Sequence, residues 1–275
     1  MTSESGAPPG SLRYFAVLFA PPAVRPVLDA LYGFEAEIRA TVEGSSHEAA
    51  HARLQWWRAE IDRMVAGRAT HPHAIALQPL RENRNVDLSL LHETLVGADL
   101  DLARLTYRNW QELEAYCYRA AGALQTVAAA ALAGERSLTE PERKFARQLG
   151  SALRQAEMIR DLRRDMRNGR QYLPIEALEA AGLDPTAVHE PASSPTLDSL
   201  LCSWRSRVGA ELASLPRLLP ERAHRSTQRP GLVLGALHEK LLAQTARSAR
   251  DPDDRAEVRP MTRLWTAWRT AVRYS

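Results

Sequence analysis

Three carboxylates, Glu157, Asp161 and Asp165, recur at every fourth residue of the segment EMIRDLRRDMRNGRQYLP, residues 157–174. A step of four residues turns only about 40° around a helix, so these side chains would form one acidic stripe. Magnesium takes one or two protein carboxylates together with phosphate oxygens of a substrate. The spacing is therefore compatible with a magnesium site that binds a diphosphate.

The same segment also allows a simpler interpretation. Arginines stand three or four residues from the acids and could pair with them on a solvated helix face, and charged helices of that kind are common. In a binding site the same arginines would instead balance phosphate charge. Spacing alone favours the solvated face. The arginines concerned are Arg160, Arg163, Arg164, Arg167 and Arg170.

The composition predicts an all-α fold for this chain of 275 residues. Apolar residues make up 45%, glycine is sparse, and runs of β-branched and aromatic residues are nearly absent. We expect eight to ten helices in one domain over residues 13–275, with three long helices over 87–106, 110–133 and 140–168 and with loops near 183–198 and 248–260. The glycines and prolines of residues 1–12 predict a disordered arm. The acidic stripe falls on a predicted helix over residues 140–168, with Thr139 as its N-cap.

Charge and cysteine usage exclude several classes of protein. The net charge is only +3, and no basic run is interleaved with aromatics, so no nucleic-acid partner is expected. Cys117 and Cys202 lack metal-ligand spacing and are predicted to be free thiols. The first residues lack the pattern of a signal peptide, which predicts a cytoplasmic protein.

The last predicted helix is strongly amphipathic. Met261, Leu264, Trp265, Trp268 and Val272 share one face, and arginines stand beside it. Such a face usually packs on a core, but it is also compatible with a protein that rests on the inner membrane as a peripheral protein.

The segment RDLRRDMRNGRQYLP resembles the second aspartate-rich motif of the squalene and phytoene synthase family. LRYFAVLFAPPAVRPVLDALYGF, from residue 12, is similar to the first helices of that family. DLDLARLTYRNWQELEAYCYRAAG, from residue 99, is similar to its middle segment. The resemblance implies a single all-α prenyl-synthase domain around a central cavity. Active members join two isoprenoid diphosphates head to head, with magnesium held between two facing aspartate-rich helices.

The resemblance assigns roles to residues that match the family motifs. Asp161 and Asp165 match the acids of the second motif; with Glu157 they would bind magnesium, and with Tyr172 they would form the catalytic group. The expected substrate-binding residues are Arg160, Arg170, Asp101, Tyr107 and Arg39.

The chain departs from the family pattern at the first aspartate-rich motif. The expected paired aspartates fall on Arg39 and Ala40, and only Glu43 keeps a carboxylate. An arginine there puts a fixed cation where Mg²⁺ would sit. Gln125 replaces a glycine of the middle segment and would narrow the cavity. Glu157 stands where the family usually has Asn.

RLQWWRAEIDRM and HPHAIAL resemble a divergent branch of the family, which includes an assembly factor of respiratory complex I. Two functions therefore stay open. One is a protein that binds an isoprenoid diphosphate with magnesium and has prenyltransferase activity. The other is a non-catalytic assembly or scaffolding factor that works through a protein partner.

Overall fold

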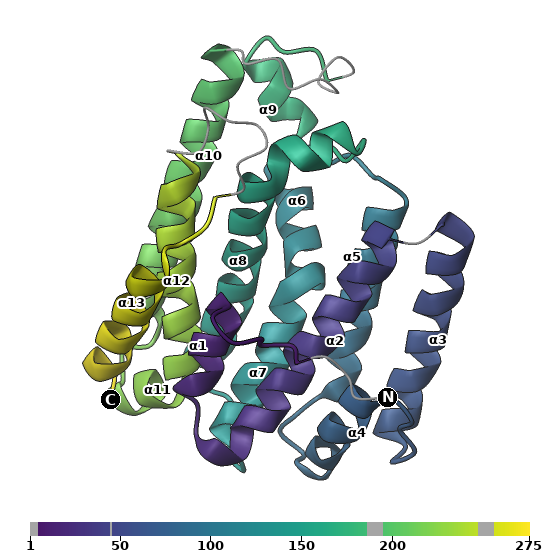
Figure 1. The fold of residues 1–275 in the computed structure, drawn as a ribbon, viewed down its shortest axis with the longest axis vertical. Coiled ribbons are helices and arrows are strands. Elements are labelled where there is room, and N and C mark those ends of the chain that lie inside the picture. The colour runs from purple at the N-terminus through teal and green to yellow at the C-terminus, as the bar shows by residue number, and fades with distance from the viewer. Residues whose placement is uncertain (1–4, 45, 186–194, 247–255) are drawn as a thin grey trace.

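The computed structural model describes residues 5–44, 46–185, 195–246 and 256–275, and over these residues it is a bundle of helices without strands (Figure 1). The all-α prediction is confirmed. The helices are α1 (Leu12–Leu18), α2 (Arg25–Gly44), α3 (His47–Val65), α4 (Pro72–Leu77), α5 (Leu91–Leu102), α6 (Trp110–Cys117), α7 (Ala123–Ala133), α8 (Glu140–Arg167), α9 (Ile175–Ala180), α10 (Pro195–Ser214), α11 (Arg222–Thr227), α12 (Arg229–Thr245) and α13 (Pro260–Arg273).

Helix α8 is the longest helix and runs through the middle of the bundle, where it packs against α7, α10 and α12 (Figure 1). Its start is a capping box in which Thr139 and Glu142 satisfy each other's backbone amides. Just beyond its end, Gly169 adopts φ of 72°, which favours glycine. These local signals explain why the predicted bounds, 140–168, agree closely with the observed ones.

The long helix predicted over residues 110–133 is interrupted. A π-helical turn at Tyr118–Gly122 separates α6 from α7. At this turn the backbone comes so close to α8 that a Cβ added at Gly150 would lie 2.5 Å from the Cα of Gly122. Glycine at both positions allows the contact, and helical periodicity alone did not reveal it. The helix predicted over 87–106 is likewise shorter, because Leu88–Leu90 is a 3-10 turn ahead of α5.

Residues 5–12, which the sequence places in the predicted disordered arm, contact α2 in the structure. The Ser5 hydroxyl and the Ala7 amide donate to the Asp29 carboxylate at 2.7 and 3.0 Å, and Ala7 is buried. This long-range contact fastens the segment to α2 ahead of α1. Residues 1–4 of the arm, and most of the two loops expected near 183–198 and 248–260, lie outside the described residues.

One large cluster of buried apolar side chains joins α2, α3, α5, α7, α8, α10 and α12. A second, smaller cluster holds α13 and α1 against α12, and it contains Phe15, Val233, Leu237, Ala267 and Ala271. Within the described ranges, no helix is long and apolar enough to span a bilayer.

The contact between Gly122 and Gly150 gives a stability prediction. Gly150→Ala should lower the free energy of unfolding by about 1–3 kcal/mol, because the added methyl overlaps the π-helical backbone. Gly209→Ala on α10 is the matched control: its methyl would meet only Leu242, at 3.7 Å. That change should leave stability unchanged or raise it by about 0.5–1 kcal/mol. Urea unfolding measures both, and equal losses would contradict the close contact.

Candidate functional site

A polar cavity of about 330 Å³ lies between α2 and the C-terminal half of α8. Two kinds of charged side chain dominate its walls. The arginines are Arg13, Arg39, Arg154, Arg160, Arg164 and Arg170. The carboxylates are Glu43, Asp101, Glu157, Asp161 and Asp165. We call this cavity the arginine pocket.

The acidic stripe of α8 faces the arginine pocket rather than bulk solvent. Asp161 and Asp165 are only 8% and 6% exposed. The helix does pair its own charges, as the simpler interpretation expected: Arg160 donates to both oxygens of Asp161, at 2.9 and 2.6 Å. Arg164 lies 3.4 Å from Asp161 and 3.7 Å from Asp165. The stripe is therefore both buried and matched by arginine charge.

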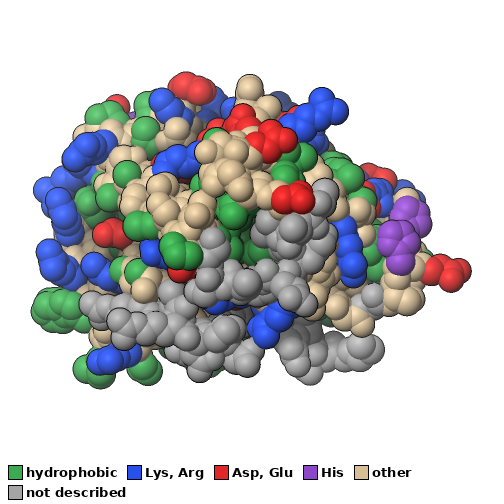
Figure 2. Space-filling model, turned by 90° about the horizontal axis from the view of Figure 1, so that it is seen from above, with side chains coloured by type: hydrophobic (Ala, Val, Ile, Leu, Met, Phe, Trp, Pro, Cys, Tyr) green, Lys and Arg blue, Asp and Glu red, His purple; other side chains and the backbone are tan. Residues whose placement is uncertain are grey.

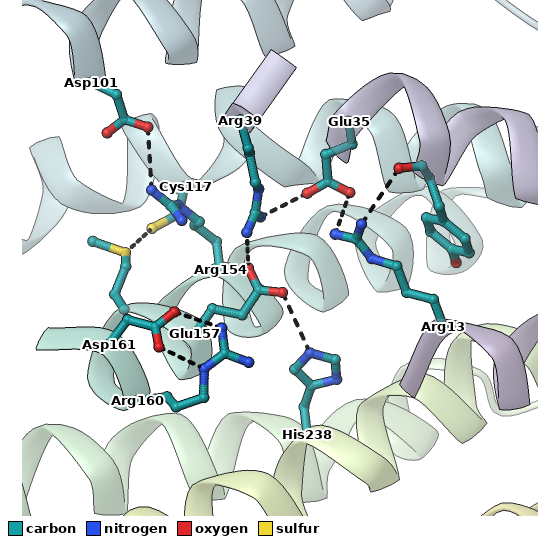
Figure 3. A network of polar contacts seen from close by, with 12 residues as sticks. Arg13, Glu35, Arg39, Asp101, Cys117, Arg154, Glu157, Arg160, Asp161 and His238 are labelled. Atoms are coloured by element: carbon teal, nitrogen blue, oxygen red, sulfur yellow. Dashed lines mark hydrogen bonds and ion pairs between the residues drawn. The ribbon is translucent and has the colours of Figure 1, made fainter. Parts of the chain in front are cut away.

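Arg39 is held between carboxylates of two helices (Figure 3). It donates to Glu35 on α2 at 2.7 Å and to Glu157 on α8. Glu35 also accepts from Arg13 of α1 at 2.7 Å, and Glu157 lies 3.8 Å from His238 of α12. The result is a polar chain that crosses four helices of the bundle.

Charge partners decide the protonation of Glu157 in this chain. Burial alone would raise its pKa, but Arg39 and the hydrogen bond from His238 lower the pKa well below the ordinary value. Glu157 is therefore a carboxylate whose negative charge is already matched by protein cations. It is not an open ligand for a metal ion.

Asp101 and Tyr172 line the pocket as the resemblance implied, but Tyr107 does not. Asp101 accepts from the Tyr172 hydroxyl at 2.7 Å and from the Tyr116 hydroxyl at 2.8 Å. The buried Tyr107 ring stacks behind them, 6.5 Å from the Tyr172 ring. Tyr107 therefore supports the wall of the pocket, and its predicted contact with substrate would need an opening that this structure does not have.

Arg154 is a site residue that the sequence analysis missed. Its guanidinium reaches Asp101 at 3.3 Å (Figure 3). It also reaches the Tyr172 hydroxyl at 3.1 Å and contacts Tyr116. Arg154 precedes Asp161 by seven residues, which is two helical turns, so both share the pocket face of α8. This seven-residue spacing was the signal in the sequence from which Arg154 could have been predicted as a site residue.

The mouth of the pocket is spanned by two contacts between the end of α2 and the end of α8. Arg164 lies 3.9 Å from Glu43, and Arg170 donates to the Val42 carbonyl at 3.1 Å. The Arg164 side chain is 42% exposed, more than any other pocket arginine that forms an ion pair in the described structure. A ligand that enters here meets these two arginines.

The resemblance implies magnesium, and the donor atoms fit it only in part. In the described portion of the chain, no three His, Cys, Asp or Glu side chains come together in a way that could hold a metal ion. Asp161 and Asp165 lie together on α8, but the facing helix offers Arg39 and Ala40. These residues suit a metal ion that substrate phosphates also bind, and they do not form two facing clusters.

The helical bundle of this chain matches the helical isoprenoid-synthase fold. A dehydrosqualene synthase with bound ligand superposes with a TM-score of 0.77 over 95% of this chain and 90% of its own, at 18% identity. The squalene synthase HpnC from Alicyclobacillus acidocaldarius has a TM-score of 0.71 over 86% and 88%, at 21% identity.

The chain belongs to the squalene/phytoene synthase family, whose model matches residues 9–263. A presqualene diphosphate synthase from Zymomonas mobilis is 27% identical over 98% of this chain and 92% of the relative. A chloroplastic phytoene synthase from Narcissus pseudonarcissus is 33% identical over 62% of this chain, but this match spans only 41% of the plant protein.

The buried Asp165 carboxyl predicts how the stability of the folded protein changes with pH. Burial raises its pKa to about 6, against the opposing charges of Arg154 and Arg164. Between its ordinary value, about 4, and this value, the folded state binds more protons than the unfolded state, so the stability contribution of Asp165 falls as pH rises through this window. Asp165→Asn removes the titration.

The free energy of unfolding of Asp165→Asn, minus that of the natural protein, should increase as pH rises from about 4 to about 6 and level off above. Urea unfolding at a series of pH values measures the difference. A difference that does not change with pH would mean that Asp165 is solvated in the folded protein.

Proposed function

We propose that this protein binds one isoprenoid diphosphate with the diphosphate group in the arginine pocket, and that it catalyses head-to-head condensation very slowly or not at all. The observation that carries the proposal is the position of Arg39, a cation fixed between Glu35 and Glu157 on the wall where the family resemblance places metal-binding aspartates. Family membership supports the class of ligand.

The charge balance of the pocket supports diphosphate binding. Six arginines line it against five carboxylates, and guanidinium groups bind phosphate oxygens in a bidentate manner. Arg164 and Arg170 stand at the mouth, where a diphosphate would exchange the contacts to Glu43 and Val42 for its own oxygens. Arg39 and Arg154 lie deeper and stay paired with carboxylates.

Magnesium enters this proposal only as an ion that accompanies the diphosphate. Asp161 and Asp165 would hold it, and when bound it would neutralise charge on the leaving diphosphate. The facing helix α2 has Arg39 and Ala40 at the positions of the expected aspartates, and Glu43 is its one carboxylate in the pocket, so α2 offers too few ligands for a second cluster of metal-binding carboxylates. A magnesium cofactor and a cytoplasmic location remain predictions.

The described cavity beside Gln125 is too small for a prenyl chain. Tyr32 and Gln125 are among the residues that line it, and its volume is only about 10 Å³. Ligand pockets usually measure about 300–1,000 Å³, so a prenyl chain would enter at this place only if the helices opened. This volume supports the expectation that Gln125 narrows the cavity.

A second candidate is a non-catalytic family member that acts as an assembly or scaffolding factor. Two observations favour it: the closed interior beside Gln125, and the pairing of Glu157 and Asp161 with arginines of the protein itself. If the pocket is purely structural, isoprenoid diphosphates will not bind, and the experiment below separates the two functions.

A substitution of Arg164 tests whether the arginine pocket binds a diphosphate. Isothermal titration with farnesyl diphosphate should give saturable binding to the natural protein, and Arg164→Ala should weaken it about tenfold, because one charged hydrogen-bond donor is lost. The control is Arg143→Ala, on the same helix and in an ion pair with Glu140, but outside the pocket. Equal affinity of the two variants, or no binding at all, would contradict the proposal.

Condensation gives a separate prediction. With farnesyl or geranylgeranyl diphosphate and Mg²⁺, the natural protein should form no squalene- or phytoene-type product at ordinary enzyme rates, because each ~1.4 kcal/mol of lost charge stabilisation costs tenfold in rate. The Zymomonas mobilis relative serves as the positive control in product analysis. Arg39→Asp with Ala40→Asp should raise, not lower, any residual rate. Rapid turnover by the natural protein would show that the first motif has been misjudged.

A further inference from the structure

The outer face of α13 is apolar and exposed in the described structure. Its inner face, with Thr266, Ala267 and Ala271, is buried against α12 and α1. Side chains at helical spacing project the other way. They are Met261, Leu264, Trp265, Trp268 and Val272, which are 75%, 47%, 59%, 48% and 57% exposed. We call this set the α13 ridge.

The ridge has the composition of a membrane-surface helix. The Trp265 and Trp268 rings lie 5.1 Å apart, and tryptophan combines a large apolar ring with a polar N–H group that suits the boundary between lipid and water. Residues 260–273 contain three arginines and no acidic residue. Half of the exposed large apolar side chains of the described chain belong to this one short helix.

A basic groove runs beside the ridge. It has a volume of about 480 Å³ and lies between α13, α12 and the Leu215–Leu218 turn. Four of its lining residues are cations, Arg217, Lys240, Arg269 and Arg273, and its one acid is Glu239. Trp265 lines the groove as well as the ridge, so the basic and apolar surfaces are continuous.

Figure 2 shows green side chains beside blue ones at the lower left edge, on the side where α13 lies in Figure 1. We propose that the α13 ridge and the basic groove together dock this protein on an anionic lipid bilayer, with the ridge among the acyl chains near the headgroups and the groove on lipid phosphates. The proposal concerns a surface distinct from the arginine pocket and does not depend on the proposed function.

Charge decides between a bilayer and a second copy of this chain. A symmetric dimer through this face would bring Arg269 and Arg273 of one copy against the same basic surface of the other. An anionic bilayer instead attracts each of these cations and accepts the apolar ridge without requiring a matching shape. A helix of 14 residues that lies flat is long enough for this mode of contact.

Co-sedimentation with vesicles tests the docking surface. The natural protein should bind vesicles of phosphatidylcholine with phosphatidylglycerol and bind much less to phosphatidylcholine alone. Trp265→Ala with Trp268→Ala should lower the partition coefficient about tenfold through lost apolar burial. Arg269→Glu with Arg273→Glu should abolish the preference for phosphatidylglycerol, since each cation contributes about fivefold near an anionic surface.

Matched changes on other faces are the controls. Ile75→Ala removes an exposed apolar side chain from α4, and Arg68→Glu with Arg84→Glu reverses two exposed charges elsewhere. Neither should change vesicle binding beyond the effect of net charge. All four variants should keep the melting temperature of the natural protein. Failure of the natural protein to bind phosphatidylglycerol vesicles, or self-association that only the ridge changes abolish, would overturn the proposal.

Discussion

The ion pairs of Arg39 are the constraint on which the site depends. Arg39 joins α2 to α8 through Glu157, and the same chain of contacts reaches α1 through Arg13 and α12 through His238. Glu35 is nearly fully buried, so removing Arg39 would leave a carboxylate in the interior with only one partner. One buried arginine thus brings with it a network across four helices. The geometry of the pocket follows from that network.

The same interaction separates two tasks that the family resemblance assigns to metal ions. Binding a diphosphate needs positive charge at the right distance, and arginines can supply it. Ionisation of an allylic diphosphate needs the positive charge to stabilise the diphosphate more strongly as it departs than when it is still bonded to the prenyl chain. Arg39 is already neutralised by Glu35 and Glu157, and Arg160 by Asp161. Under the proposed function, the pocket is therefore better equipped to bind a diphosphate than to ionise it, and the small cavity at Gln125 further restricts the space for a prenyl chain.

Local signals in the sequence predicted α8 and its ends, but the described residues form thirteen α-helices where eight to ten were expected. Long-range contacts explain several of the errors. Thr139 and Gly169 set the ends of α8 through capping, which needs no partner far along the chain. By contrast, Arg154 became part of the site by reaching Asp101, 53 residues away, and the N-terminal segment is ordered by Asp29. The π-helical turn depends on the approach of Gly150. The N-terminal contact and the π-helical turn leave no periodic pattern in the sequence, whereas Arg154 could have been found from its seven-residue spacing to Asp161.

Metal dependence of ligand binding tests the central claim, that arginines rather than metal ions neutralise the diphosphate. The measurement is the affinity for farnesyl diphosphate by isothermal titration, first with Mg²⁺ and then with an excess of chelator. We predict that binding persists without metal and weakens by no more than about tenfold, which is the contribution of an ion shared with Asp161 and Asp165. Loss of all binding in the chelator would contradict this account and show that the remaining aspartates still hold the metal on which recognition depends.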